Sequence, residues 1–128
     1  MFWLTKNGVY ISATDIRKLQ LAKAAVAAGI QTLLHHVGIT EEQVKSLVLA
    51  GGFGSRMDLH SAAKIGLFPK ALLPMADTLG NTAGEGTALA LCSGTARKSL
   101  QDIRERCKYV ELSTSEVFNE QFIEQMTF

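Results

Sequence analysis

The sequence predicts an α/β fold in which a small mixed sheet is flanked by helices. An apolar run at residues 46–50 has the length of a buried strand and ends at a pair of glycines. One helical pattern precedes this run at residues 14–36, and another follows it at residues 82–91. Strands that alternate with helices in this way are typical of α/β proteins. The 128 residues suffice for one domain or for part of one.

The chain is expected to begin with a hairpin. Residues 2–4 and 9–11 form two short strands, because the Asn-Gly pair between them favours a tight turn. Ser12 and Asp15 then give the Ser-x-x-Asp pattern of a helix start.

A long helix is expected from Thr14 to His36. Its apolar residues recur at helical spacing: Ile16, Leu19, Val26, Ile30, Leu33 and Val37. Residues 22–29 are nearly all small, so this part of the helix can lie close to a sheet or another helix, and we expect it to be buried. Gly38 is placed to end the helix in a left-handed conformation.

Shorter elements are expected in the remainder of the chain. Residues 40–43 form a capped turn, and a brief helix begins at Asp58 or Ser61 and ends at Gly66. Residues 67–75 hold both prolines and are expected to be extended or looped, with room for a short strand. The later elements are helices at residues 82–91 and 95–106, broken or bent at Gly94, a strand at residues 109–112 and a helix at residues 115–126.

Composition and charge exclude several classes of protein. A net charge of +1 gives no electrostatic reason to expect nucleic acid or an acidic membrane surface as a partner. The apolar stretches are interrupted by Lys, Arg or His, so no segment is expected to span a membrane. Cys92 and Cys107 lie far apart without a Cys-x-x-Cys pattern, which favours two reduced thiols in a cytoplasmic protein over a metal site.

The strongest candidate for a binding site is the glycine segment that follows the apolar run. Gly51, Gly52 and Gly54 lack a Cβ, so their backbone amides can approach a ligand closely. The polar groups nearest to such a ligand are Ser55, Arg56 and Asp58. Two interpretations stay open at this point: a nucleotide site at the end of a strand, or a tight turn whose glycines only serve packing.

A second small-residue segment opens the helix at residue 82. Asn81 or Thr82 serves as its N-cap, and Gly84 and Gly86 lie where another backbone can come close. The segment either lines the opposite wall of a nucleotide cleft or allows helix packing. Arg56, from the first segment, either lies against an adenine ring, pairs with a phosphate or is a solvated surface residue.

No catalytic set is predicted. His35 and His36 lie in the last turn of the long helix, where the helix dipole favours a cation, and this explains them without a metal. His60 is expected on the surface. No Ser-His-Asp order and no close pair of carboxylates stands out, so the sequence predicts a binding surface without catalytic or metal-binding residues.

Two families resemble the glycine segment. Residues 49–57, followed by residues 69–74, resemble the signature of sugar-phosphate nucleotidyltransferases, in which the glycine loop and a lysine, here Lys70, hold a nucleoside triphosphate. That resemblance covers about 25 residues, and only 54 residues follow Pro74, too few for the large domain of those enzymes.

The other resemblance runs through nearly the whole chain, to the carboxy-terminal domain of reductive activators of corrinoid proteins. The matching blocks, in order, are residues 15–25 with 28–30, 49–54, 61–62, 65–69, 80–88, 109–112 and 118–122. These activators are ATP-dependent proteins of the sugar kinase, heat-shock chaperone and actin superfamily. The resemblance implies half of an actin-like, ribonuclease H-like ATPase core, with residues 1–128 as a single carboxy-terminal subdomain of a longer chain.

The resemblance also implies the site residues. Gly51, Gly52, Phe53 and Gly54 match the adenosine motif, which contacts ribose and α-phosphate through its backbone, and Ser55 and Arg56 follow it. The residues that match the helix on the far side of the cleft are Asn81, Ala83 and Gly84. The expected cofactor is ATP or ADP with magnesium.

Full-length members carry an amino-terminal two-iron two-sulfur ferredoxin domain and couple ATP to the reduction of cob(II)alamin to cob(I)alamin. This implies a corrinoid protein or methyltransferase as partner and an adenine nucleotide as ligand. Neither nucleic acid nor a membrane is expected as a partner, and a homodimer is a possible oligomeric state. The cysteine cluster and the aspartate-glycine phosphate motif are missing from this sequence. The chain alone is therefore expected to lack activity. The alternatives are a nucleotidyltransferase and a non-catalytic interaction module with the same fold.

Overall fold

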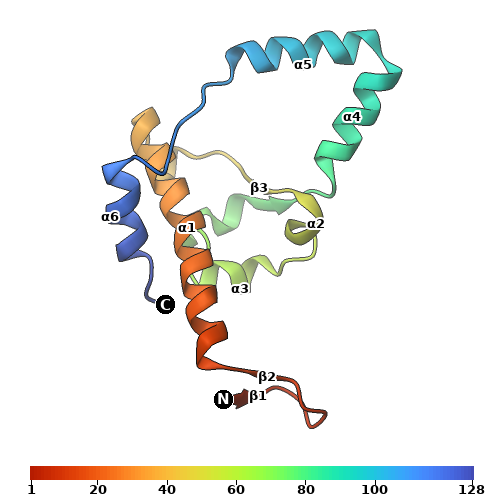
Figure 1. The fold of residues 1–128 in the computed structure, drawn as a ribbon. Helices are drawn as coiled ribbons and strands as arrows, with labels where there is room; N and C mark the ends of the chain where they lie inside the picture. The colour runs from red at the N-terminus through yellow and green to blue at the C-terminus, as the bar shows by residue number, and fades with distance from the viewer.

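The structure is a computed structural model that describes residues 1–128. A long central helix, α1, separates a small α/β body from the last helix, α6, and two further helices project away as an arm (Figure 1). In chain order the elements are β1 (Phe2–Trp3), β2 (Tyr10–Ile11), α1 (Ala13–Val37), η1 (Glu41–Gln43), β3 (Leu47–Leu49), α2 (Gly51–Gly54), α3 (Leu59–Lys64), η2 (Lys70–Met75), β4 (Ala76–Thr78), α4 (Thr82–Cys92), α5 (Gly94–Arg106) and α6 (Glu116–Glu124).

The hairpin and the start of α1 confirm the sequence prediction. β1 and β2 pair antiparallel, with Trp3 opposite Tyr10 and their ring centroids 5.2 Å apart. Ser12 and Asp15 form a capping box, in which the Asp15 amide donates to Ser12 Oγ and the Ser12 amide donates to Asp15 Oδ2. The Ser12 hydroxyl also donates to Asp15 Oδ2, at 2.7 Å, and this bond together with the one from the Ser12 amide lowers the pKa of the Asp15 carboxyl. Gly38 ends the helix at φ 74°.

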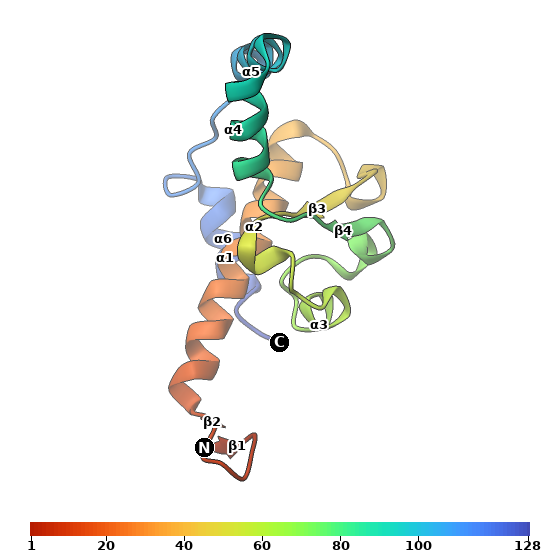
Figure 2. The same ribbon diagram turned by 90° about the vertical axis from the view of Figure 1, so that its right-hand side faces the viewer.

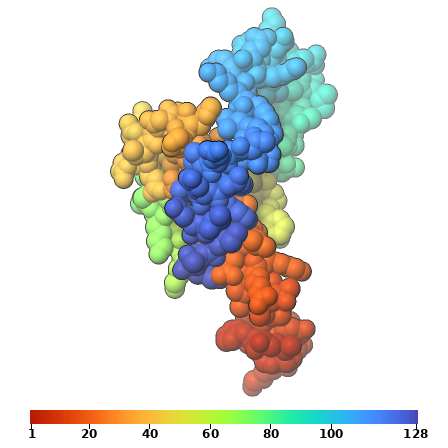
Figure 3. Space-filling view, turned by 60° about the vertical axis from the view of Figure 1, so that its left-hand side comes forward, coloured from red at the N-terminus to blue at the C-terminus, as the bar shows by residue number.

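One face of the small-residue part of α1 is buried, as predicted, whereas Ala22, Ala25 and Val26 in the same stretch are exposed. Ala24, Ala27 and Ala28 are at most 3% exposed, and a Cβ on Gly29 would lie 3.6 Å from Leu112. The small side chains therefore let the body and the segment that leads into α6 approach the helix closely (Figure 3). The larger apolar residues whose spacing predicted the helix are more exposed than the buried alanines. Leu19, Val26 and Leu33 are each more than 40% exposed.

The α/β body is built on one pair of parallel strands. Leu47 pairs with Ala76 and Leu49 with Thr78, so β3 and β4 run side by side (Figure 2). The crossover between them passes through α2, α3 and η2, which cover a core of four buried residues: Ala62, Ala63, Phe68 and Leu72. The expected mixed sheet is thus present as two separate pairs, one antiparallel and one parallel.

Side-chain caps start α3 at Asp58, one of its two predicted starts, and α5 at Ser93, one residue before the predicted break at Gly94. The Asp58 carboxylate accepts from the Ser61 amide at 2.8 Å, and Gly66 follows α3 at φ 79°. The break between α4 and α5 falls at Ser93, whose hydroxyl caps α5 by accepting from the Ala96 amide at 3.2 Å. Neither α4 nor α5 contains a buried residue.

Two predictions are wrong. Residues 70–75 form the 3₁₀-helix η2, and the strand begins only afterwards at Ala76. Residues 109–112 form no strand. There the Glu111 carboxylate accepts from the Tyr109 hydroxyl at 2.5 Å and from the Ser113 amide at 3.0 Å, so local side-chain hydrogen bonds take the place of a strand neighbour. The alternating residues at these positions pair with neither of the two strand pairs.

The carboxy-terminal tail is fixed by a buried lysine. Lys23 on α1 is 2% exposed, donates to the Thr127 carbonyl and lies 5.4 Å from the centre of the Phe128 ring. Burial lowers the pKa of the Lys23 ammonium. A Cβ on Gly66 would lie 3.3 Å from Lys23 Nζ, so this lysine joins α1, the end of α3 and the tail.

Candidate functional site

The structure brings the two small-residue segments together at one end of the parallel strands. Gly51 lies two residues after the end of β3, and Gly80 and Asn81 lie two and three residues after the end of β4. The Leu79 amide donates to the Leu49 carbonyl at 2.9 Å, and the Gly51 amide donates to the Gly80 carbonyl at 2.9 Å. Both segments therefore lie at the carboxyl edge of the strand pair, which is where open α/β sheets bind ligands.

Two of the three glycines in the first segment are explained by the fold. The expected turn is a short helix, α2, and Gly51 enters it at φ 93°, a conformation that side chains disfavour. Gly54 is buried, and a Cβ there would lie 3.0 Å from the Leu49 carbonyl carbon. Gly51 is thus required by the backbone turn, and Gly54 by its close contact with β3.

Gly52 has no such internal reason. Its φ is not positive, so its backbone conformation does not require glycine. No atom lies within 4 Å of the position that a Cβ would occupy. The absence of a side chain at Gly52 therefore leaves the backbone of α2 accessible to a ligand at this position.

Phe53 and Arg56 stand beside this opening. Phe53 is 91% exposed, and Arg56 is also exposed. Together with Gly52 and Met57 they line a hollow of about 410 Å³. Ser55 lies apart from that lining and donates its hydroxyl to the Gly52 carbonyl at 3.4 Å. An exposed aromatic ring next to a guanidinium suits a flat, electron-rich ligand.

Met57 was not predicted to line this hollow. It lies in the coil between the end of α2 at Gly54 and the start of α3 at Leu59, so no helical spacing in the sequence could have identified it.

The second segment is arranged by its cap. Asn81 accepts from the Gly84 amide at 3.1 Å, which confirms its prediction as an N-cap. A Cβ on Gly84 would lie 2.5 Å from Asn81 Nδ2, so glycine leaves room for the capping side chain. Ala83 and Gly84 are exposed, as is Asn81 itself. None of these three residues lines the hollow beside Gly52. The two small-residue segments therefore do not form a common pocket within this chain.

The histidines and cysteines do not add chemistry to the site. His35 and His36 lie in the last turn of α1, and His60 is exposed on α3. Cys92 and Cys107 are free and exposed. No three His, Cys, Asp or Glu side chains gather in a way that could hold a metal ion. No helix is at once long enough and apolar enough to cross a bilayer.

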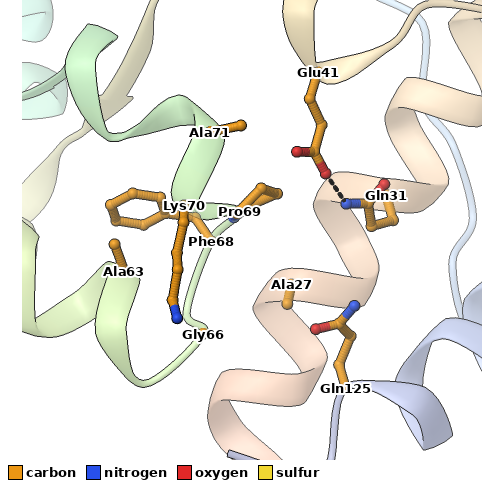
Figure 4. Close-up of a pocket in the computed structure, with 10 residues that line it drawn as sticks. All are labelled: Ala27, Gln31, Glu41, Ala63, Gly66, Phe68, Pro69, Lys70, Ala71 and Gln125. Carbon is orange, nitrogen blue, oxygen red and sulfur yellow. Dashed lines mark hydrogen bonds between the residues drawn. The ribbon is translucent and has the colours of Figure 1, made fainter.

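Lys70 lies in a different part of the molecule. It lines a separate cavity between η2 and α1, opposite Gln31 and Glu41 (Figure 4). Neither Gly52 nor Phe53 lines that cavity. The glycine loop and the lysine of the nucleotidyltransferase pattern therefore do not line a common pocket.

Comparison with known families decides between the two resemblances. The family model for the C-terminal domain of RACo, the ASKHA domain, matches residues 3–128. The chain belongs to this family. The RACo C-terminal match overturns the nucleotidyltransferase alternative and confirms the α/β fold as that of an actin-like ASKHA domain.

Two similar proteins show in which kind of protein such a domain occurs. The corrinoid activation enzyme RamQ of Eubacterium limosum is 34% identical over 120 residues, which are 94% of this chain and 20% of that protein. A solved structure of a reductive activator for a corrinoid, iron-sulfur protein superposes with a TM-score of 0.83 at 33% identity, over 91% of this chain and 18% of that one. The chain thus spans about a fifth of the length of these relatives.

Proposed function

We propose that this chain is the adenosine-binding half of an ATP-dependent reductive activator of corrinoid proteins. The observation that carries the proposal is the hydrogen bond from the Gly51 amide to the Gly80 carbonyl. It holds the adenosine motif and the start of α4 together at the carboxyl edge of two parallel strands, a position suited to a nucleotide.

Each residue has a distinct part in the proposed site. The open backbone at Gly52 approaches the ribose and α-phosphate, because no side chain or neighbouring atom stands in the way. Phe53 offers its exposed ring to the adenine, and Arg56 either stacks on the base or pairs with a phosphate. Asn81 and the exposed backbone at Ala83 and Gly84 form the neighbouring wall.

Magnesium fits this chain less well than adenosine does. Mg²⁺ prefers oxygen ligands, usually carboxylates together with phosphates and water, and the one carboxylate predicted near the ligand, Asp58, accepts from the Ser61 amide as the cap of α3. We therefore assign the magnesium and terminal-phosphate contacts to the remainder of a longer protein. The two-iron two-sulfur cluster is assigned there as well, since the chain has only two cysteines.

The exposed apolar surface supports the proposal that residues 1–128 are a subdomain of a longer chain. Leu89 and Leu91 on the arm are 61% and 75% exposed, and Val48 on β3 is 46% exposed. β3 pairs on one edge only. Strand edges and apolar helix faces of this kind are normally covered in a complete protein.

For the full-length protein we propose coupling of ATP to the reduction of cob(II)alamin to cob(I)alamin in a cytoplasmic corrinoid protein or methyltransferase. The printed functions of the two relatives support this assignment. A homodimer is compatible with it and stays a prediction.

Titration of the purified chain with ADP, followed by amide chemical shifts, tests the proposal. Because half of the cleft is absent, the dissociation constant should lie between high micromolar and millimolar. This corresponds to a binding free energy of roughly −4 to −6 kcal/mol. ATP should behave like ADP, and the shifts should centre on residues 51–56 and 81–84. Absence of shifts at millimolar nucleotide would favour a non-catalytic interaction module.

The same sample should show no magnesium-dependent ATP hydrolysis above background, because phosphoryl transfer needs the metal and phosphate contacts of the other half. Robust turnover would contradict the assignment of those contacts to the rest of the protein.

A further inference from the structure

A second cavity lies between α1 and η2, away from the glycine segment. Its volume is about 400 Å³, within the range of pockets that hold small molecules. It shares no lining residue with the proposed adenosine site. Its walls come from η1, α1, α3, η2 and the residue that follows α6, as Figure 4 shows.

The apolar part of the cavity is well fixed. Phe68, Ala27 and Ala63 line it and are each at most 3% exposed. Buried side chains of this kind keep their rotamers, so the cavity is a lasting feature of the fold. The Phe68 ring is packed in the core with Ala63 and Leu72, behind the cavity, and Pro69 supplies the apolar surface that faces α1 (Figure 4).

The polar groups carry opposite charges on opposite walls. Lys70 extends along the η2 side, while Glu41 and Gln31 stand on the α1 side (Figure 4). Gln31 Nε2 donates to Glu41 Oε1 at 2.6 Å, which orients the carboxylate. Gln125, below them, adds an amide that can donate or accept.

We propose that this cavity binds a small zwitterion that carries a free amine and a free carboxylate. The ligand carboxylate lies at Lys70, the ammonium group at Glu41, and the apolar side chain against Pro69. A simple anion would be repelled by Glu41 and a simple cation by Lys70, whereas a zwitterion is favoured by both walls. Amino acids and short peptides share this chemistry. The inference goes beyond the proposed adenosine site and does not depend on it.

Titration of the purified chain with L-leucine and with glycyl-L-leucine, followed by amide shifts, tests the proposal and separates the two sources. At least one probe should move resonances at residues 27–31, 63–71 and 125 at concentrations up to about 10 mM. The probe that binds more tightly identifies the source. 4-Methylpentanoate lacks the amine and isoamylamine lacks the carboxylate, and each should bind at least about tenfold more weakly.

Matched variants assign the charges. Lys70→Gln and Glu41→Gln should each weaken binding of the zwitterion about tenfold, whereas Lys70→Arg should retain it and Lys98→Gln on α5 should have no effect. Glu41→Gln keeps an oxygen for Gln31, and its amide shifts should report an intact fold. In this variant 4-methylpentanoate should no longer bind more weakly than leucine.

Three results would overturn the proposal. They are the absence of shifts with either zwitterion, equal binding of 4-methylpentanoate and leucine by the unaltered chain, and zwitterion binding that Lys70→Gln leaves unchanged.

Discussion

The body around β3 and β4 and the arm formed by α4 and α5 differ in what holds them in place. The body contains four buried core residues, whereas the arm contains none. Side-chain caps start α3 in the body and α4 and α5 in the arm, so local sequence defines helix starts in both regions. The difference teaches that the body is stabilised by burial and the arm by its caps and helical hydrogen bonds. The arm therefore presents its apolar residues to whatever covers it.

The largest expected effect compares one leucine from each region. Leu72 in the body is 1% exposed and Leu89 on the arm is 61% exposed. Leu72→Ala should lower the free energy of unfolding by about 2–5 kcal/mol, because it leaves a cavity in the core. Leu89→Ala should change it by less than about 0.5 kcal/mol. Urea unfolding followed by circular dichroism measures both, and similar losses would mean that the arm also packs against the body.

The next effect separates structural from open glycines. Gly54→Ala places a Cβ 3.0 Å from the Leu49 backbone and should cost about 1–3 kcal/mol. Gly86→Ala on the arm meets no atom within 4 Å and should be neutral or slightly stabilising, by up to about 1 kcal/mol. Thermal melting of the two variants gives the comparison. A Gly54→Ala protein as stable as the unaltered chain would remove the close contact with β3 from the account.

A smaller effect concerns the cap that starts the second helix of the arm. Ser93→Ala removes the hydroxyl that accepts from the Ala96 amide and should destabilise α5 by about 1 kcal/mol. Hydrogen exchange should rise in the first turn of α5 and stay unchanged at residues 62–72 of the body. Faster exchange throughout the body would show that the two regions unfold as one unit.

The smallest effect is electrostatic and lies in the segment between the arm and α6. Hydrogen bonds from Ser113 and Tyr109 lower the pKa of the Glu111 carboxyl from 4.5 to about 2. Because the Glu111 pKa is lower in the folded than in the unfolded chain, ionised Glu111 contributes to the free energy of unfolding. This contribution is complete above about pH 4.5 and is lost as the pH falls toward 2. Tyr109→Phe should move the Glu111 pKa upward, which carbon-detected titration measures. An unchanged value would mean that the tyrosine hydroxyl does not reach the carboxylate in solution.

Features decided by neighbouring residues were predicted well from the sequence. The Ser12 capping box, the left-handed Gly38 and the Asn81 cap each depend on a few consecutive positions, and all three are present. The order of the body elements around the glycine segment was also predicted, since apolar runs and helical spacing determine it.

Features decided by distant contacts were not predicted. The strand expected at residues 109–112 is missing because a pattern does not say whether a sheet edge is available. The roles of the glycines in the candidate site needed coordinates, because only the structure separates Gly51 and Gly54, which the fold requires, from Gly52, which it does not. The cavity between α1 and η2 likewise brings together Lys70 and Glu41, which are 29 positions apart in the sequence.

Gly52→Val tests the central claim, that the adenosine motif uses an open backbone at Gly52 to receive nucleotide. Because its Cβ position is free and its φ is not positive, the variant should stay within about 1 kcal/mol of the unaltered chain in thermal melting. Gly94→Val is the matched control, since Gly94 is also open and lies in the first turn of a helix. In ADP titrations the control should keep the shifts at residues 51–56 and 81–84, and Gly52→Val should lose them. A folded Gly52→Val protein that binds ADP with unchanged affinity would contradict the account.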